Sequence, residues 1–200
     1  MILKGSQRAN GDDLATHLMN AYDNEWVELA ELSGTVAEDL HGAFAEFDLV
    51  ASGTRARQPL YSLSINPSEP LTRDQYADAI ARIEARLGLQ DQPRAVVFHI
   101  KDGREHCHVV WSRIDVEHMK AIQMSHDHRR LCDLSCELAH EFGHELPPGL
   151  KAWEKQEAFR KDRIEPRYDE NIRAAETGIT PEERQADITA AYVGADNGAA

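Results

Sequence analysis

The sequence of 200 residues predicts an α+β fold, in which a mostly antiparallel, palm-like sheet has helices packed on one face. Two observations lead to this fold class. Segments with the apolar spacing of helices alternate with short runs typical of strands. Asp102-Gly103 also lies between two apolar runs, and this dipeptide favours the tight two-residue turn of an antiparallel hairpin. A chain of this length suits one domain, or one domain with a tail.

The first fifty residues predict two helices with a strand between them. The first helix can be capped by Asp12 or Asp13, because their side chains can accept hydrogen bonds from its free N–H groups. A strand is expected over 26–32, where apolar and acidic residues alternate. Thr35 and Glu38 have the spacing of a capping box, which predicts the start of the second helix.

The middle of the chain predicts a strand and a long helix before the hairpin. The strand covers 60–66 and is stopped by Pro67. Thr72 and Gln75 form another capping box, and Gly88 is suited to end the helix that begins there. The hairpin follows directly.

The last part of the chain predicts a helix over 125–142 and then a change of character. After residue 150 the chain becomes charged and poor in apolar residues. Thr180-Pro181 has the pattern of one more helix start. We therefore predict a domain over 1–150, followed over 151–200 by a charged, partly helical C-terminal tail or linker to a missing domain.

Three histidines are expected to gather on one face of the hairpin. With Asp102 and Gly103 at the turn, His99 lies directly opposite His106. Because side chains alternate along a strand, His108 shares that face and lies diagonal to His99, about 7–8 Å away between Cα atoms. Three neutral imidazoles that leave other positions open are typical of a catalytic metal site. We therefore predict that His99, His106 and His108 bind a divalent metal ion.

The run H-x6-H-x-H, followed by apolar residues and Arg113, resembles the three-histidine motif of HUH endonucleases. It is most similar to the mobilisation relaxases of plasmid conjugative transfer, over most of the chain up to about residue 150. The resemblance implies an enzyme that nicks one DNA strand at a transfer origin and keeps the 5′-phosphate in a covalent adduct. It also implies single-stranded DNA as a partner, accessory mobilisation proteins, and Mn²⁺ or Mg²⁺, or else Zn²⁺, as the ion.

The resemblance leaves two candidates for the nucleophile, His17 and Tyr22. The family commonly uses a tyrosine in or just after the first helix, followed by leucine and preceding an acidic-apolar strand. His17-Leu18 fits the first feature, and Tyr22 fits only the second. If both were on one helix they would be about 140° apart, so they could not both face the site. Histidine can act as the nucleophile through a phosphoramidate, and His17 is slightly favoured.

Three further residues are candidate DNA contacts. Ser64 lies in a Ser-Pro strand end that is similar to a family motif, and Arg104 and Arg113 are available for phosphates. The net charge of −13 argues against a long duplex footprint but permits a short single-strand groove.

Two alternatives compete with this interpretation. The run His140-Glu141-Phe142-Gly143-His144 matches H-E-x-x-H, the helix signature of zinc metalloproteases. The chain could also be a DNA-binding accessory module, similar to relaxases, that has lost its nucleophile.

The composition also bears on the compartment. The three cysteines are an odd, scattered set, which is typical of a reducing cytoplasm rather than a disulfide framework. The sequence contains no apolar run of 18 residues, so no membrane segment is expected. The N-terminus lacks the apolar region of a signal peptide. We therefore expect a bacterial cytoplasmic protein.

Overall fold

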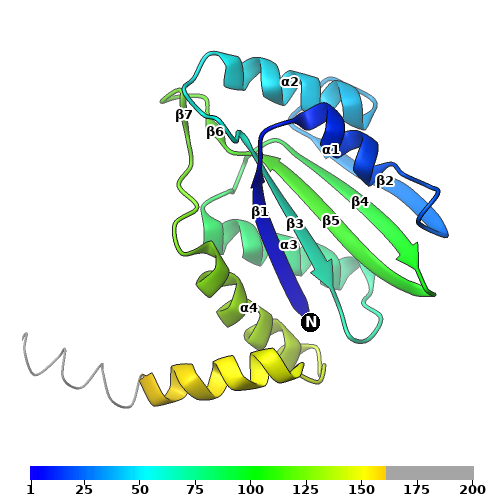
Figure 1. Ribbon diagram of the computed structural model, residues 1–200, viewed down its shortest axis with the longest axis vertical. Coiled ribbons are helices and arrows are strands. Elements are labelled where there is room, and N and C mark those ends of the chain that lie inside the picture. Colours follow the sequence, from blue (N-terminus) through cyan, green and yellow to red (C-terminus); the bar gives the residue numbers. More distant parts are fainter. Residues whose placement is uncertain (161–200) are drawn as a thin grey trace, which may run out of the picture. The chain divides into compact units, whose positions relative to one another are not determined.

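A five-stranded antiparallel sheet is the centre of the computed structural model, which describes residues 1–160 (Figure 1). Its strands lie in the order β1-β3-β5-β4-β2, and a two-stranded sheet of β6 and β7 follows. The strands are β1 (Ile2–Arg8), β2 (Trp26–Ser33), β3 (Leu60–Asn66), β4 (Arg94–Lys101), β5 (Arg104–Ser112), β6 (Ile114–Asp115) and β7 (Lys120–Ala121). The helices are α1 (Gly11–Leu18), α2 (Leu40–Ser52), α3 (Arg73–Leu87) and α4 (Asp127–Glu141). The predicted α+β class and antiparallel sheet are confirmed.

The hairpin of β4 and β5 has the predicted turn and register. Asp102 and Gly103 both have positive φ, 51° and 69°, as a two-residue turn of this type requires. Lys101 pairs with Arg104 across the turn. The local preference of the Asp-Gly pair therefore fixes which residues face each other along both strands.

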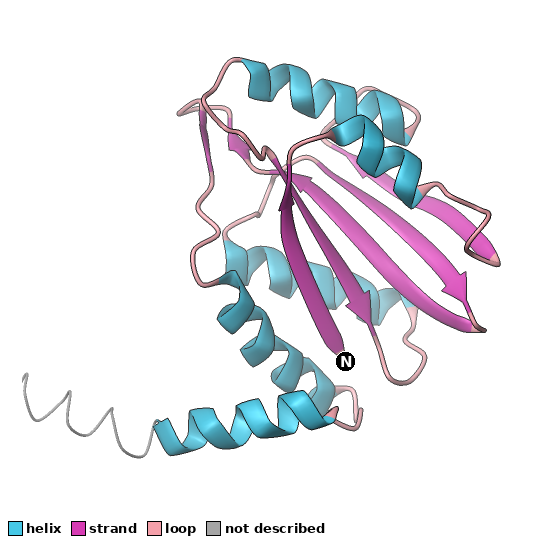
Figure 2. Cartoon of the chain, viewed as in Figure 1, coloured by secondary structure: helices cyan, strands magenta, loops and turns pink. Residues whose placement is uncertain are grey.

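Helices lie on both sides of the strands (Figure 2), which corrects the expectation that they cover one face only. On one face, α3 and α4 bury the larger core, which includes Phe98, Cys107 and Trp111. On the other face, α1 and α2 pack over Val97 and Val110 at one end of the sheet. The physical reason is that both faces of the central strands are apolar at that end, so each face needs a cover.

The third helix follows its local sequence closely. Thr72 and Gln75 form the predicted capping box, and Gly88 ends the helix with φ of 74°. The guanidinium of Arg73 lies 3.4 Å from the centre of the Phe98 ring and also forms ion pairs with the carboxylates of β2 and β5. The start of α3 is thereby fixed against the strands that carry the histidines.

Two predicted helix starts are wrong. Helix α2 begins with Asp39 as its cap, whereas the Thr35 hydroxyl donates to the carboxylate of Glu46. Helix α1 is capped by Asn10, whose side chain accepts from the Asp13 N–H. In both cases a neighbouring short polar side chain forms the cap, because several residues in a row have the right chemistry.

A buried carboxylate joins α3 to the sheet. Glu84 is only 8% exposed, and its Oε1 accepts from Arg94 at 2.6 Å and from the Trp111 indole at 2.7 Å. Arg94 also donates to Glu31 at 2.9 Å. Removing one partner from a buried ion pair leaves the other charge buried without a partner, which lowers the stability of the fold.

We expect Glu84→Ala to lower the free energy of unfolding by about 3 kcal/mol, since Arg94 and Trp111 both lose an acceptor. The matched control is Glu137→Ala, because Glu137 pairs with Arg86 at the surface and should cost less than about 1 kcal/mol. Urea unfolding measures both values. Equal losses in the two variants would show that the Glu84 network contributes no more than a surface ion pair.

Residues Met1–Leu150 form one compact unit. A separate helical stretch begins at residue 148 and continues to 160, the last described position. The helix predicted at Thr180-Pro181, and most of the predicted tail over 151–200, lie outside the described residues. Within the described part of the chain, no helix is long and apolar enough to cross a membrane.

Candidate metal centre and active site

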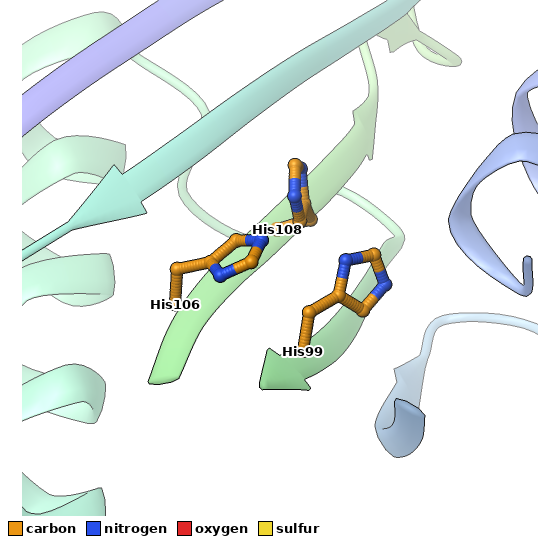
Figure 3. Close-up of side chains that lie close together, drawn as sticks. All are labelled: His99, His106 and His108. Atoms are coloured by element: carbon orange, nitrogen blue, oxygen red, sulfur yellow. The ribbon is translucent and has the colours of Figure 1, made fainter. Parts of the chain in front are cut away.

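The three predicted ligands come together on one face of the β4–β5 hairpin (Figure 3). His99 pairs directly with His106, and one nitrogen from each of His99, His106 and His108 lies within 4.8 Å of the others. The ring centres are 5.2 Å apart for His99–His106, 4.8 Å for His99–His108 and 5.2 Å for His106–His108. Among residues 1–160, no other group of three or more potential ligands is this close.

On the face opposite the histidines, β4 and β5 pack against a buried core. Cys107 lies between His106 and His108 but points to the opposite face, where it pairs with Phe98. Both side chains are buried in the core under α3 and α4. A packed core directly behind the site limits the motion of the ligands, as a preorganised site requires.

A backbone carbonyl orients the His99 ring. Nε2 of His99 donates to the carbonyl of Leu18, the last residue of α1, at 2.7 Å. The other nitrogen of that ring faces His106 and His108 (Figure 3). Such outer contacts are typical of metal-binding histidines, because they fix the tautomer and leave the second nitrogen free for the ion.

Burial keeps the imidazoles neutral. It lowers the pKa of His99, His106 and His108. The pKa of His108 falls to about 3, because the neighbouring histidines add to the effect of burial. At neutral pH each ring therefore has a lone pair available. Three converging neutral nitrogens fit a divalent ion that keeps positions open for another ligand.

The pKa of His108 predicts how stability depends on pH when metal is removed with a chelator. The unfolded chain binds this proton near pH 6.5, whereas the folded chain binds it only near pH 3. The free energy of unfolding is highest above pH 6.5, where neither state binds this proton. It falls as the pH drops toward 3, because the unfolded chain binds the proton first. We expect the wild type to lose up to about 2 kcal/mol more than His108→Gln between pH 6.5 and 5, measured by urea unfolding. Identical acid profiles would contradict this origin.

Of the two candidate nucleophiles, His17 lies nearer to the cluster in the fold. It is exposed in the last turn of α1, directly before the Leu18 carbonyl that orients His99. Its charge also contributes to lowering the pKa of His99 and of His108. Tyr22 is 96% exposed in the loop after α1. Because α1 ends at Leu18, the angular argument that assumed one helix for both residues does not apply.

The predicted DNA contacts lie in different places. Ser64 pairs with His108 across β3 and β5, so it lies beside the cluster. Arg104 lies on the histidine face at the end of the hairpin, close enough to affect the pKa of His106. Arg113 lies beyond the far end of β5, is 9% exposed and donates to Gln7. The structure therefore does not bring Arg113 to the histidines.

The H-E-x-x-H run does not form a metalloprotease helix. Helix α4 ends at Glu141, and Gly143 has a left-handed φ of 72°. His144 therefore lies after the helix, with its N–H donating to the carbonyl of Ala139. Without a continuous helix, His140 and His144 cannot share one helical face as the signature requires.

Two parts of the site have no clear signal in the sequence. The Leu18 carbonyl is a backbone group, so no residue type marks it. Glu25 accepts a hydrogen bond from the Gly103 N–H at 3.2 Å, while its own N–H donates to Ile100. These contacts join the loop after α1 to the hairpin turn. They depend on the pairing of β2 with β4, which brings the two segments together.

The family comparison agrees with this geometry. The family described as relaxase, MobA/VirD2-like, nuclease domain, matches residues 17–144. The chain belongs to this family. The matched range of this relaxase contains both candidate nucleophiles and all three histidines. No curated protein matches the chain significantly. The relaxase family is one of DNA-nicking enzymes that depend on metal in general, and the histidine cluster is consistent with that dependence.

Proposed function

We propose that this relaxase is a metal-dependent, site- and strand-specific DNA endonuclease that nicks a transfer origin for plasmid mobilisation. The observation that carries the proposal is the convergence of three neutral imidazoles next to an exposed histidine of α1, in a chain of the relaxase family. The substrate is one DNA strand, presented single-stranded at the origin. The free cysteines and this substrate both favour the bacterial cytoplasm.

The chemistry is a transesterification at phosphorus. An unprotonated ring nitrogen of His17 attacks the scissile phosphorus, a P–N bond forms, and the P–O3′ bond breaks. The 3′-oxygen leaves and takes up a proton, so one product is a free 3′-hydroxyl and the other a 5′-phosphate attached to the protein. The attached phosphate can later be passed to another 3′-hydroxyl, which rejoins the strand.

His99, His106 and His108 would hold the ion in this reaction. A bound divalent cation supplies positive charge to a phosphate oxygen and helps to align the attack. Imidazole ligands leave that charge intact, whereas carboxylates would partly cancel it. We propose Mn²⁺ or Mg²⁺, with Zn²⁺ as the alternative, since affinity order alone does not select among them.

Tyr22 is the second candidate for the attacking group. Its exposed ring lies on a short loop that ends where β2 begins beside the hairpin, which would allow its hydroxyl to reach a bound strand. Arg104 and Ser64 are proposed DNA contacts at the site. Arg113 remains a proposed contact only for DNA that extends along the sheet, away from the cluster. Accessory mobilisation proteins would open the duplex.

The proposal is tested with a pool of randomised single-stranded oligonucleotides and the full chain in Mn²⁺. After denaturation, DNA that stays attached to the protein is isolated and sequenced. We expect one enriched sequence, joined through its 5′-phosphate and formed only with metal. If no adduct forms with Mn²⁺, Mg²⁺ or Zn²⁺, the chain is not a nicking enzyme, and the accessory-module alternative takes its place.

A further inference from the structure

We propose that the exposed face of β1 binds the backbone of the DNA strand that flanks the scissile phosphate, with Lys4 and Arg8 as its phosphate contacts. The inference rests on the proposed function and adds the path of the substrate to it. Strand β1 lies outside the residues that match the family, so the match does not assign it a role.

The sheet register connects Lys4 to the histidines. Lys4 pairs with Ser64 across β1 and β3, and Ser64 pairs with His108 across β3 and β5. Paired residues share a face, so the three side chains project from the same side of the sheet. Two strand spacings separate Lys4 from His108 at the backbone, roughly 10 Å. A nucleic acid strand held at the histidines therefore needs only a short segment to reach β1.

The two basic residues of β1 are free to take an anion. Lys4 and Arg8 are both exposed, and neither side chain forms a hydrogen bond or ion pair with any described residue. They are four positions apart on one strand, so they share a face and are about 13 Å apart along it. They are also the only lysine or arginine residues among the first fifty, a segment that is otherwise strongly acidic.

Serine side chains lie on the same face of the sheet as these two charges and the histidines. Ser6 pairs with Ser62, and both lie on the histidine face between the positions of Lys4 and Arg8. The Ser64 oxygen already accepts from the Asn66 amide at 3.0 Å, which leaves its hydroxyl proton available to donate. Lysine, arginine and serine side chains of this kind commonly bind phosphate and sugar oxygens without reading the base.

Charge also selects the direction in which the strand leaves the site. On the β2 side of the histidines, the loop before β2 carries Asp23 and Glu25, and Glu25 is hydrogen-bonded to the hairpin turn. These carboxylates would repel a phosphate backbone. The β1 side has the opposite charge, so the strand is expected to cross β3 and run along β1.

The test compares binding of a fluorescein-labelled dT20 oligonucleotide to three full-length proteins by anisotropy at several salt concentrations. These are the wild type, Lys4→Ala with Arg8→Ala, and the control Arg55→Ala with Arg57→Ala. The control removes the same charge from two exposed arginines in the loop after α2. We expect the β1 variant to bind about tenfold more weakly and its log–log salt slope to fall by about 1.4, since each single-strand phosphate contact contributes about 0.7.

Two results would overturn the inference. Equal weakening of dT20 binding in both double variants would mean that the total charge of the protein alone accounts for the effect. Binding of dT20 by the β1 variant as tight as by the wild type would mean that β1 does not contact the strand. The randomised-pool experiment keeps this failure separate from failure of the proposed function. A wild type that forms the covalent adduct, beside a β1 variant that binds dT20 normally, removes only the β1 path. A wild type that forms no adduct and does not bind dT20 removes both.

Discussion

Replacing His106 and His108 together by alanine is expected to reduce metal-dependent nicking by at least about 10³-fold. A bound ion contributes several kcal/mol of charge stabilisation to phosphoryl transfer, and each 1.36 kcal/mol corresponds to a factor of ten. Loss of two of three ligands leaves His99 alone, which cannot hold the ion. The measurement is the rate of adduct formation on the oligonucleotide selected from the randomised pool.

The matched control for this variant is His140→Ala with His144→Ala. It removes two histidines from the end of α4, where the helix stops before the second one. Nicking should stay within about twofold of the wild type. Full activity in the His106/His108 variant would mean that the hairpin does not take part in the reaction.

The second large effect is expected at α1. We expect His17→Ala to abolish the covalent adduct while leaving Mn²⁺ affinity unchanged, because His17 is proposed to attack phosphorus and not to bind the ion. Loss of the attacking group removes the covalent path as a whole, so the decrease should exceed about 10³-fold. Mass spectrometry of the adduct, which locates the modified residue, provides the direct measurement.

Two variants complete this comparison. His41→Ala removes another exposed histidine, on the adjacent helix α2, where it hydrogen-bonds to Asp12, and should leave the adduct unaffected. Tyr22→Phe removes only a hydroxyl. An adduct that survives in His17→Ala but disappears in Tyr22→Phe would assign the attack to the tyrosine.

The features that could be predicted from the sequence are those determined by neighbouring residues. Asp102-Gly103 sets the turn by its local conformational preference, and the turn then sets the register that places His99 opposite His106. The capping box of Thr72 and Gln75 is likewise complete within four residues. The histidine cluster was therefore predictable, since both the motif and its geometry are local.

The features that were missed depend on contacts between distant segments. Thr35 and Glu38 have the spacing of a cap, but Glu46 takes the Thr35 hydroxyl and Asp39 caps α2 instead. The placement of α1 and α2 on the histidine side depends on which apolar surfaces the sheet leaves uncovered. The ambiguity between His17 and Tyr22 has the same origin, because it depends on where α1 ends.

Titration of the metal-free protein with Mn²⁺ in a calorimeter tests the central claim most directly. We predict one ion per chain for the wild type and for His140→Ala with His144→Ala, and no binding for His106→Ala with His108→Ala. If instead only the α4 variant loses the ion, the metal is not at the hairpin, and the active site built on His99, His106 and His108 is contradicted.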